Sequence, residues 1–229
     1  MADTLRLSRI LTLTAGLATA LVLSAAVPAN AAATDVARWN LGDSGSTMSD
    51  ATGRGHTGTL HSVTVRQPGV SGGYGYGFSK HPAYVSVPTS ADFRPGTGAF
   101  QISLNIKTAT LPSASVVDYD LLRVGLGSTS GGSYKVEILI NGRAYCNFRG
   151  SSGEVSLSAG PNLADNRWHS ITCRRSGSTV TLTVDGSSWS KSGSTGTISN
   201  NSTLYIGAKD GGGADQYTGL MDYVRIAKG

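Results

Sequence analysis

A period-two alternation of apolar and polar residues, repeated through the last third of the chain, is the feature that most constrains the fold. His169, Ile171 and Cys173 alternate with polar neighbours, and residues 180–184 and 219–226 continue the pattern. A period of two places alternate side chains on opposite faces of a β-strand, so it predicts half-buried strands rather than helices. Polar and glycine-rich segments between these stretches mark the turns.

The same pattern extends into the earlier part of the chain. Residues 100–107 alternate cleanly, and the dipeptide at 141–142, Asn-Gly, is a strong hairpin turn. Glycine accounts for 31 of 229 residues and charged residues for only 14%, which suits short strands and many turns. We therefore expect an all-β fold in which residues 32–229 form a single antiparallel two-sheet sandwich.

Residues 1–31 have the composition of a secretory signal. Arg6 and Arg9 form a basic start, residues 10–23 are apolar, and a small-x-small cleavage site ends at Ala31. The apolar stretch is too short to span a bilayer, although an uncleaved anchor is the alternative. No later stretch is apolar enough for a membrane helix, so we expect a secreted protein without a membrane span after cleavage.

The charge of the chain gives little indication of its partner. The formal net charge of +5 is mild, and it falls slightly once the leader is removed. Five arginines suggest a basic cluster, but no aromatic ladder or lysine run accompanies them, so a solvated strand face is the simpler interpretation. We therefore expect no nucleic-acid partner. The five arginines are Arg143, Arg149, Arg167, Arg174 and Arg175.

Cys146 and Cys173 are the only two cysteines. An even number in an exported chain favours a disulfide, with two buried free thiols as the alternative. Alternation places Cys146 on one face with Phe148 and Cys173 on one face with Ile171. Both faces are apolar and inward, so pairing between neighbouring strands is sterically plausible. Closing this loop would stabilise the fold by about 3–4 kcal/mol.

Four segments of the last third occur in an order that resembles the laminin G-like, concanavalin A-like jelly-roll domains. They are Trp168-His169, Val184-Asp185-Gly186, Leu204-Tyr205-Ile206-Gly207 and Gly219-Leu220-Met221-Asp222-Tyr223-Val224-Arg225-Ile226. The loop 50–58 is similar to the family's Asp-x-x-Gly-Asn-Gly-x-x-Gly segment, with Arg54 in place of asparagine. The resemblance covers nearly all of residues 36–227 and implies a concanavalin A-like jelly roll. This fold hosts lectins, adhesion modules, glycosidases and lyases, so the resemblance implies no single activity.

The resemblance also implies one structural calcium ion, held between the loop after the first strand and the start of the last strand. By residue, it assigns the carboxylates of Asp50 and Asp222 and backbone carbonyls near Gly53 and His56, which are oxygen ligands suited to a hard cation. The alternative is that Asp222 accepts backbone or arginine hydrogen bonds and that Asp50 caps a turn. The loop 210–215 looks faintly like a calcium loop, but a flexible surface turn is the simpler interpretation.

Candidate catalytic residues are sparse. Glu137 and Glu154 are isolated, and Asp118 and Asp120 share one strand face with no third partner, so the paired-carboxylate motif of glycosidases on this fold is absent. We expect His169 to be a satisfied core histidine, and no zinc-ligand spacing occurs. A polysaccharide lyase is the sharpest enzymatic alternative, because its proton carrier would come from tyrosine and basic residues in central strands. These are Tyr119, Arg123, Tyr134, Lys135, Arg143 and Tyr145.

Sugar binding needs exposed aromatic rings together with planar polar side chains. We therefore predict a secreted, non-catalytic binding module for carbohydrate or for an extracellular partner. A polysaccharide-active enzyme and a structural or adhesive exported protein are the alternatives. The sequence identifies no ligand-binding residue and no oligomeric state. The candidates for stacking on a sugar are Tyr119, Tyr145, Trp189, Tyr205 and Tyr217.

Overall fold

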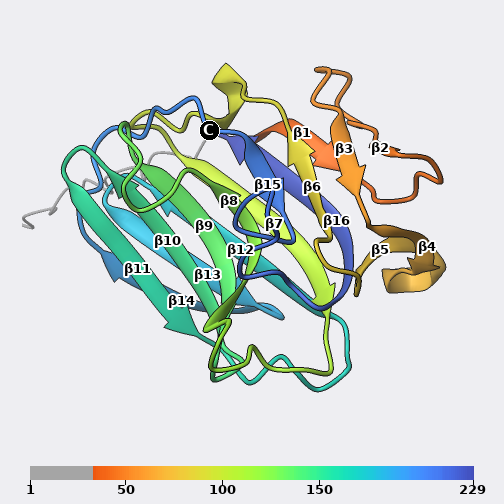
Figure 1. Cartoon of the computed structure of the whole chain (residues 1–229). Helices are drawn as coiled ribbons and strands as arrows, with labels where there is room; N and C mark the ends of the chain where they lie inside the picture. Colours follow the sequence, from red (N-terminus) through yellow and green to blue (C-terminus); the bar gives the residue numbers. More distant parts are fainter. Residues whose placement is uncertain (1–32) are drawn as a thin grey trace, which may run out of the picture. The chain divides into compact units, whose positions relative to one another are not determined.

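The computed structural model describes residues 33–229, which form sixteen strands and two short 3-10 helices (Figure 1). The predicted leader lies outside the described residues. Among those residues, no helix has the length and hydropathy needed to cross a membrane. The elements are β1 (Thr34–Trp39), β2 (Thr47–Met48), β3 (Gly58–His61), β4 (Thr64–Pro68), η1 (Val70–Gly72), β5 (Tyr74–Phe78), β6 (Tyr84–Val87), η2 (Ala91–Phe93), β7 (Phe100–Lys107), β8 (Asp118–Val124), β9 (Ser133–Leu139), β10 (Ala144–Gly150), β11 (Gly153–Ala159), β12 (His169–Ser176), β13 (Thr179–Val184), β14 (Ser187–Ser192), β15 (Leu204–Ile206) and β16 (Gly219–Lys228).

The strands form two antiparallel sheets of eight strands each. Sheet A has the order β14-β13-β12-β7-β16-β5-β4, and β1 also pairs with β16. Sheet B has the order β11-β10-β9-β8-β15-β6-β3-β2. Strands that are distant in sequence are neighbours in both sheets, as when β7 lies between β12 and β16, and such connections are typical of a jelly roll. The predicted all-β, two-sheet jelly-roll sandwich is confirmed.

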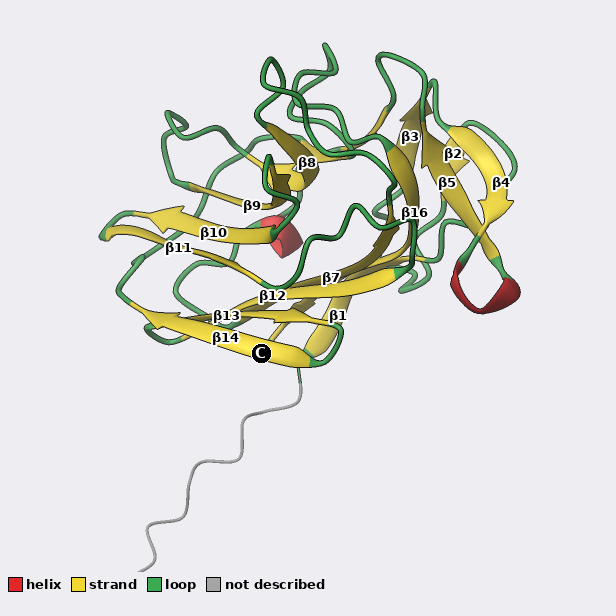
Figure 2. Ribbon diagram, turned by 90° about the horizontal axis from the view of Figure 1, so that it is seen from below, coloured by secondary structure: helices red, strands yellow, loops and turns green. Residues whose placement is uncertain are grey.

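The two sheets pack face to face around a shared core, and Figure 2 shows β10 and β11 as one layer over β12, β13 and β14. In β7, Phe100, Ile102 and Leu104 are buried, whereas the polar residues between them are partly exposed, as alternation predicts. From sheet B, the rings of Tyr134 and Phe148 lie 4.9 and 6.4 Å from that of Phe100. Burying each such apolar side chain contributes about 1.5–3 kcal/mol, so this interface is the main stabilising element.

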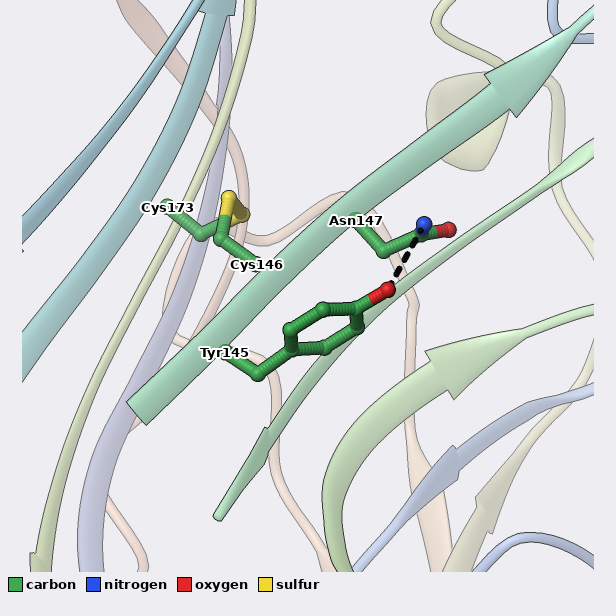
Figure 3. The surroundings of a disulfide bond; sticks show 4 residues. All are labelled: Tyr145, Cys146, Asn147 and Cys173. Atoms are coloured by element: carbon green, nitrogen blue, oxygen red, sulfur yellow. Dashed lines mark hydrogen bonds between the residues drawn. A yellow bond between two sulfur atoms is a disulfide. The ribbon is translucent and has the colours of Figure 1, made fainter. Parts of the chain in front are cut away.

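The disulfide between Cys146 and Cys173 joins the two sheets across the core (Figure 3). Cys146 belongs to β10 of sheet B and Cys173 to β12 of sheet A, with their Cα atoms 5.6 Å apart. The predicted bond is confirmed, but the expectation that it links neighbouring strands is wrong. Both cysteines face inward, and the inward faces of different sheets meet in a sandwich. Tyr145 and Asn147 point away from Cys146, toward the outer face of sheet B (Figure 3).

Arg175 is buried at one end of the core rather than on a solvated basic face. Its Nη2 donates to the carbonyl oxygens of Gly98 and Gly96 at 2.7 and 2.9 Å, and its Nη1 donates to Thr195 at 3.1 Å. The guanidinium also lies 5.7 Å from the ring centroid of Phe148. Arg175 therefore supplies hydrogen bonds to polar groups of two loops, the one that contains Gly96 and Gly98 and the one that contains Thr195.

Removing the disulfide should destabilise the fold without changing it. A Cys146→Ala/Cys173→Ala variant should lose about 3–4 kcal/mol of unfolding free energy, because the bond closes a 27-residue separation in the unfolded chain. Urea titrations of both proteins measure this loss. A strong reductant should lower the urea midpoint of the wild type and leave the variant unchanged. A wild-type midpoint that does not move after full reduction would contradict the prediction.

Candidate functional site

The outer face of sheet B carries a row of polar and aromatic side chains across neighbouring strands. Tyr205 pairs with Ser86 on one side and with Arg123 on the other. Lys135 pairs with Arg123 on one side and with Asn147 on the other. In their strands these residues lie between apolar residues that face the core, so their side chains point outward.

A β-bulge in β8 brings Arg123 to this face. Asp120 pairs with Glu137 and Arg123 pairs with Lys135, but the register shifts at Leu121 between them. An extra residue in one strand reverses the side on which the following residues point. Without the bulge, Asp120 and Arg123 would lie on opposite faces of the sheet.

Arg123 lies between two buried carboxylates. Its Nε donates to Asp120 Oδ1 and its Nη2 to Glu137 Oε1, both at 2.8 Å. Lys135 forms an ion pair with the same oxygen of Glu137. Asp120 and Glu137 are 0% and 1% exposed, so pairing must offset the loss of water around their charges. The expectation that Glu137 is isolated is wrong.

The loop between β15 and β16 adds a third aspartate to the two on β8. The backbone carbonyl of Asp215 accepts a hydrogen bond from the Asp120 amide at 2.9 Å, and its carboxylate accepts one from Lys209 Nζ at 2.8 Å. Asp215 has a φ of 48°, in the left-handed region, at the point where the loop turns. Side-chain oxygens of Asp118, Asp120 and Asp215 all lie within 4.8 Å of one another. The expectation that the two β8 aspartates have no third partner is therefore wrong.

Burial raises the pKa of three carboxyl groups here, those of Asp118, Asp120 and Glu137. It is the largest cause for both Asp118 and Asp120, and at Asp120 the positive charge of Arg123 opposes it. For Glu137, burial and the charge of Asp120 outweigh the effect of Lys135 and raise the pKa to about 8. Burial alone would lower the pKa of Arg123, but the carboxylates raise it above its usual value. The guanidinium thus stays charged.

A cleft of about 210 Å³ opens beside this cluster. The aromatic ring of Tyr84 lies next to that of Tyr205, with centroids 5.8 Å apart, and His61 stacks on Tyr84 at 4.2 Å. Three adjacent strands, β3, β6 and β15, thus carry a strip of rings that leads to the cleft. The cleft walls include Arg123, Leu126, Thr129, Thr203, Tyr205 and Lys209.

Two of the five aromatic residues predicted for sugar stacking lie on this face. Tyr145 and Tyr205 are partly exposed on the outer face of sheet B. Tyr119 and Tyr217 are instead buried and pack against each other with ring centroids 5.8 Å apart. Trp189 lies on β14, at the edge of sheet A.

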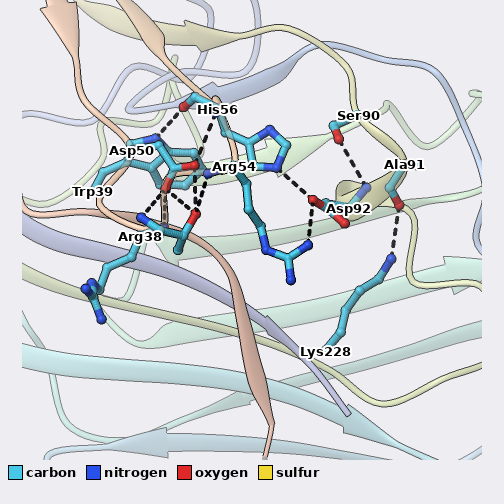
Figure 4. A network of polar contacts seen from close by, with 10 residues as sticks. Arg38, Trp39, Asp50, Arg54, His56, Ser90, Ala91, Asp92 and Lys228 are labelled. Atoms are coloured by element: carbon cyan, nitrogen blue, oxygen red, sulfur yellow. Dashed lines mark hydrogen bonds and ion pairs between the residues drawn. The ribbon is translucent and has the colours of Figure 1, made fainter.

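Asp50, Gly53 and His56, which were predicted to hold calcium, lie in one loop between β2 and β3. Figure 4 shows Asp50 and His56 with their hydrogen bonds. The Asp50 carboxylate accepts hydrogen bonds from the amides of Thr52 and His56 at 2.9 and 3.2 Å. Partial burial would raise the pKa of Asp50, but these hydrogen bonds, led by that of Thr52, bring it below its usual value. The His56 carbonyl accepts the indole N–H of Trp39 at 2.6 Å. Asp50 therefore caps this loop.

The fourth predicted ligand, Asp222, accepts a hydrogen bond at Oδ2 from the Val70 amide at 3.0 Å. Burial raises the pKa of Asp222 despite this bond. Among the described residues, Asp222 and Asp50 share no hydrogen-bond partner, and backbone N–H groups point at both carboxylates. Calcium binding by the four residues stays a prediction.

His169 is held between two aspartates at the start of β12. Its Nδ1 lies 2.7 Å from Asp185 Oδ2, and its Nε2 lies 2.9 Å from Asp165 Oδ1. Burial would lower the pKa of His169, but hydrogen bonds to Asp185 and Asp165 raise it above its usual value. The hydrogen bond from His169 in turn lowers the pKa of Asp165. With both ring nitrogens engaged, His169 fixes two turns of the fold.

The stabilisation from His169 should depend on pH. Because its folded pKa lies above the unfolded value of about 6.5, the stabilisation is complete below that pH and is lost as the pH rises through the folded pKa. His169→Gln should therefore lower the unfolding free energy more at about pH 5.5 than at about pH 9. Urea titrations at both pH values measure this loss. In an Asp185→Asn background, where His169 has lost one partner, the loss caused by His169→Gln should differ less between the two pH values. An equal loss at the two values would contradict the prediction.

Comparison with known proteins agrees with the topology. The family profile described as the concanavalin A-like lectin/glucanases superfamily, of laminin G type, matches residues 79–229. No curated protein matches the sequence at a significant level. The binding domain of paraclostridial mosquitocidal protein 1 is similar in structure, with a TM-score of 0.61, 16% identity, and coverage of 83% of this chain and 47% of that one.

Two further solved structures show the same fold. Domains LG4–5 of the mouse laminin α1 chain give a TM-score of 0.53 at 20% identity, covering 71% of this chain and 44% of that one. Domain 4 of AbnA, an extracellular arabinanase from Geobacillus stearothermophilus, in complex with arabinotriose, gives a TM-score of 0.64 at 14% identity, covering 86% of this chain and 93% of that one.

At these identities the solved structures show the fold alone, and the chain spans less than half the length of the toxin and laminin fragments. The family profile, however, extends over well more than half of the 229 residues. It covers β6 to β16, which include the central strands of both sheets. The chain therefore belongs to the concanavalin A-like lectin/glucanase superfamily, in its laminin G type.

Proposed function

We propose that this protein is an extracellular carbohydrate-binding module and that it binds glycan on the outer face of sheet B. The observation that carries the proposal is the strip of rings from β3, β6 and β15 that ends in the cleft at Tyr205. Sugar rings stack on aromatic faces, and planar or charged side chains at the edge of the stack bind their hydroxyl groups. Arg123 and Lys209 stand at that edge.

The size and lining of the cleft support a small polar ligand. Pockets for drug-sized molecules have volumes of about 300–1,000 Å³, so a cleft of about 210 Å³ suits one unit of a longer chain. Thr129 and Thr203 contribute hydroxyl groups and Leu126 an apolar wall. A glycan would extend from the cleft along the rings of Tyr84 and His61.

Similar proteins supply a precedent for this use of the fold. The arabinanase domain was solved with arabinotriose, and the toxin fragment is described as a binding domain. The predicted secretory leader would place this protein among extracellular glycans. An extracellular protein partner is the other form of the same proposal, because an aromatic and charged face also suits protein recognition.

An enzymatic role on this face is the second candidate. Glu137, whose pKa of about 8 would suit a general acid, lies beside Asp120. Both carboxyl groups are almost fully buried, however, so a polysaccharide has no access to them. Tyr134, proposed as a lyase proton carrier, is also buried and donates to the Phe93 carbonyl at 3.0 Å. Binding is therefore better supported than turnover.

A glycan array probed with the purified protein tests the proposal. For the strongest hit, Tyr205→Ala should weaken the affinity about tenfold, which corresponds to about 1.4 kcal/mol, because the stacking ring is lost. Isothermal titration calorimetry measures the affinity. Trp189→Ala is the matched control, since it removes a partly exposed ring from the edge of sheet A, and it should bind as the wild type does.

The same experiment separates the alternatives. Release of shorter products from a bound glycan would favour a polysaccharide-active enzyme over a binding module. No binding to any glycan would contradict the proposal and would favour a structural or adhesive role. Equal affinity of Tyr205→Ala and wild type would show that the ligand binds elsewhere.

A further inference from the structure

We propose that the outer face of sheet A carries a second ligand site, which binds one sugar unit with a carboxylate group, that is, a uronic acid unit of a polysaccharide. The site is a cleft of about 350 Å³ where β7, β16, β5 and β4 lie side by side. It is on the other sheet from the proposed glycan site at Tyr205, so the inference goes beyond the proposed function and does not depend on it.

Four residues form a row across this part of the sheet. They pair across neighbouring strands and are Lys107 of β7, Leu220 of β16, Gly77 of β5 and Thr64 of β4. In β7, β16 and β5 a residue next to this row is buried in the core, so the row itself faces outward.

Gly77 leaves a hollow in the middle of the row. A Cβ atom at this position would lie 3.1 Å from Gln67 Cγ, 3.5 Å from Leu220 Cδ2 and 3.6 Å from Thr64 Cβ. The φ of Gly77 is outside the left-handed region, so the backbone conformation does not require a glycine here. The missing side chain thus makes the floor of the cleft out of backbone.

Hydrogen bonds join three segments that form one wall of the cleft. Thr108 Oγ1 donates to the Thr218 carbonyl at 2.7 Å, and the Asn166 amide donates to the Thr108 carbonyl at 2.8 Å. Thr108 is 2% exposed, so water does not compete for these bonds. The wall is therefore ordered before a ligand arrives, which lowers the entropy that binding costs.

The cleft offers hydroxyl and amide groups beside an apolar surface. Gln67 and Asn166 bring planar amides, Thr64 and Thr110 bring hydroxyl groups, and Leu220 is apolar. Its volume is within the range of about 300–1,000 Å³ that is usual for small-ligand sites. Amides and hydroxyl groups both donate and accept hydrogen bonds, as the hydroxyl groups of a sugar require.

Lys107 makes the cleft suitable for an anion. Among the described residues that line it, Lys107 has the one charged side chain and none is acidic. Within residues 33–229 its ammonium group has no carboxylate partner, whereas Lys209 pairs with Asp215 and Lys135 with Glu137. A carboxylate of the ligand would supply this partner and form a charge-assisted hydrogen bond.

A peptide strand fits the cleft less well than a sugar. Peptides that bind a sheet often add a strand to its free edge through backbone hydrogen bonds. The floor of this cleft is in β5, one strand in from the edge strand β4, and its polar groups include many side chains. A ligand with several hydroxyl groups matches such a lining.

Isothermal titration calorimetry with acidic disaccharides tests the site. The probes are the disaccharides of polygalacturonate, alginate and hyaluronan, and lactose and cellobiose are the neutral comparison. At least one acidic disaccharide should bind in a 1:1 ratio and more tightly than both neutral ones. Lys107→Gln should weaken that binding about tenfold, because a hydrogen bond between charged groups is lost.

Two control variants make the result specific. Lys191→Gln removes a lysine from β14 of the same sheet, outside the cleft, and should bind as the wild type does. Gly77→Ala adds a methyl group to the floor and should weaken binding severalfold. Gly45→Ala adds one where no atom lies within 4 Å and should have no effect.

This site and the one on sheet B can fail separately. Tyr205→Ala should leave the affinity for the acidic disaccharide unchanged. Loss of that affinity in Tyr205→Ala but not in Lys107→Gln would overturn the second site. The absence of heat with every acidic disaccharide at about 10 mM, where a millimolar Kd is measurable, would also overturn it.

A measurement on the wild type decides the question if Lys107→Gln or Gly77→Ala fails to fold. In NMR spectra titrated with the acidic disaccharide, the amide signals of Thr108, Thr110 and Asn166 should shift. Shifts confined to the strip around Tyr205 would overturn the proposal.

Discussion

Contact between the inward faces of the two sheets is the interaction on which the rest of this structure depends. Every second residue of β7, β9, β10 and β12 faces the core, and the disulfide joins the two layers there. Since successive residues of a strand point to opposite sides, the core also determines which residues remain on the outer faces. Apart from Arg175 at one end of the core, the polar side chains that could meet a ligand therefore lie on the outer faces and in the loops.

The outer face of sheet B departs from a simple solvated surface because its charges are buried. Asp120, Arg123 and Glu137 are covered although they do not face the core. The loop between β15 and β16 lies against β8 through the Asp120–Asp215 backbone hydrogen bond. Charges removed from water in this way need mutual pairing, and one broken pair leaves an uncompensated charge. The cluster thus fixes both the loop and the adjoining cleft.

Alternation predicted the fold and the inward position of both cysteines, because it reports a local property of each strand. It failed where a β-bulge interrupts the alternation and where a loop distant in sequence packs against a strand. The bulge at Leu121 moved Arg123 to the face of Asp120, and no residue type in β8 signals that extra position. Asp215 reached β8 from a loop about a hundred residues away in sequence. Neither the shifted register of β8 nor the contact of the Asp215 loop with β8 can be derived from the sequence around Arg123 or Asp215.

The two outer faces also differ in how well their polar groups are satisfied. On sheet A, Thr181 pairs with Ser190 at 2.8 Å, Thr183 with Ser188 at 2.7 Å and Ser103 with Thr172 at 3.0 Å. In each of these pairs one hydroxyl donates to the other. Sheet B instead combines partly exposed rings with buried carboxylate oxygens that accept no hydrogen bond from any residue of 33–229. A surface whose polar groups are incomplete is where binding yields free energy, which supports the proposed recognition on sheet B.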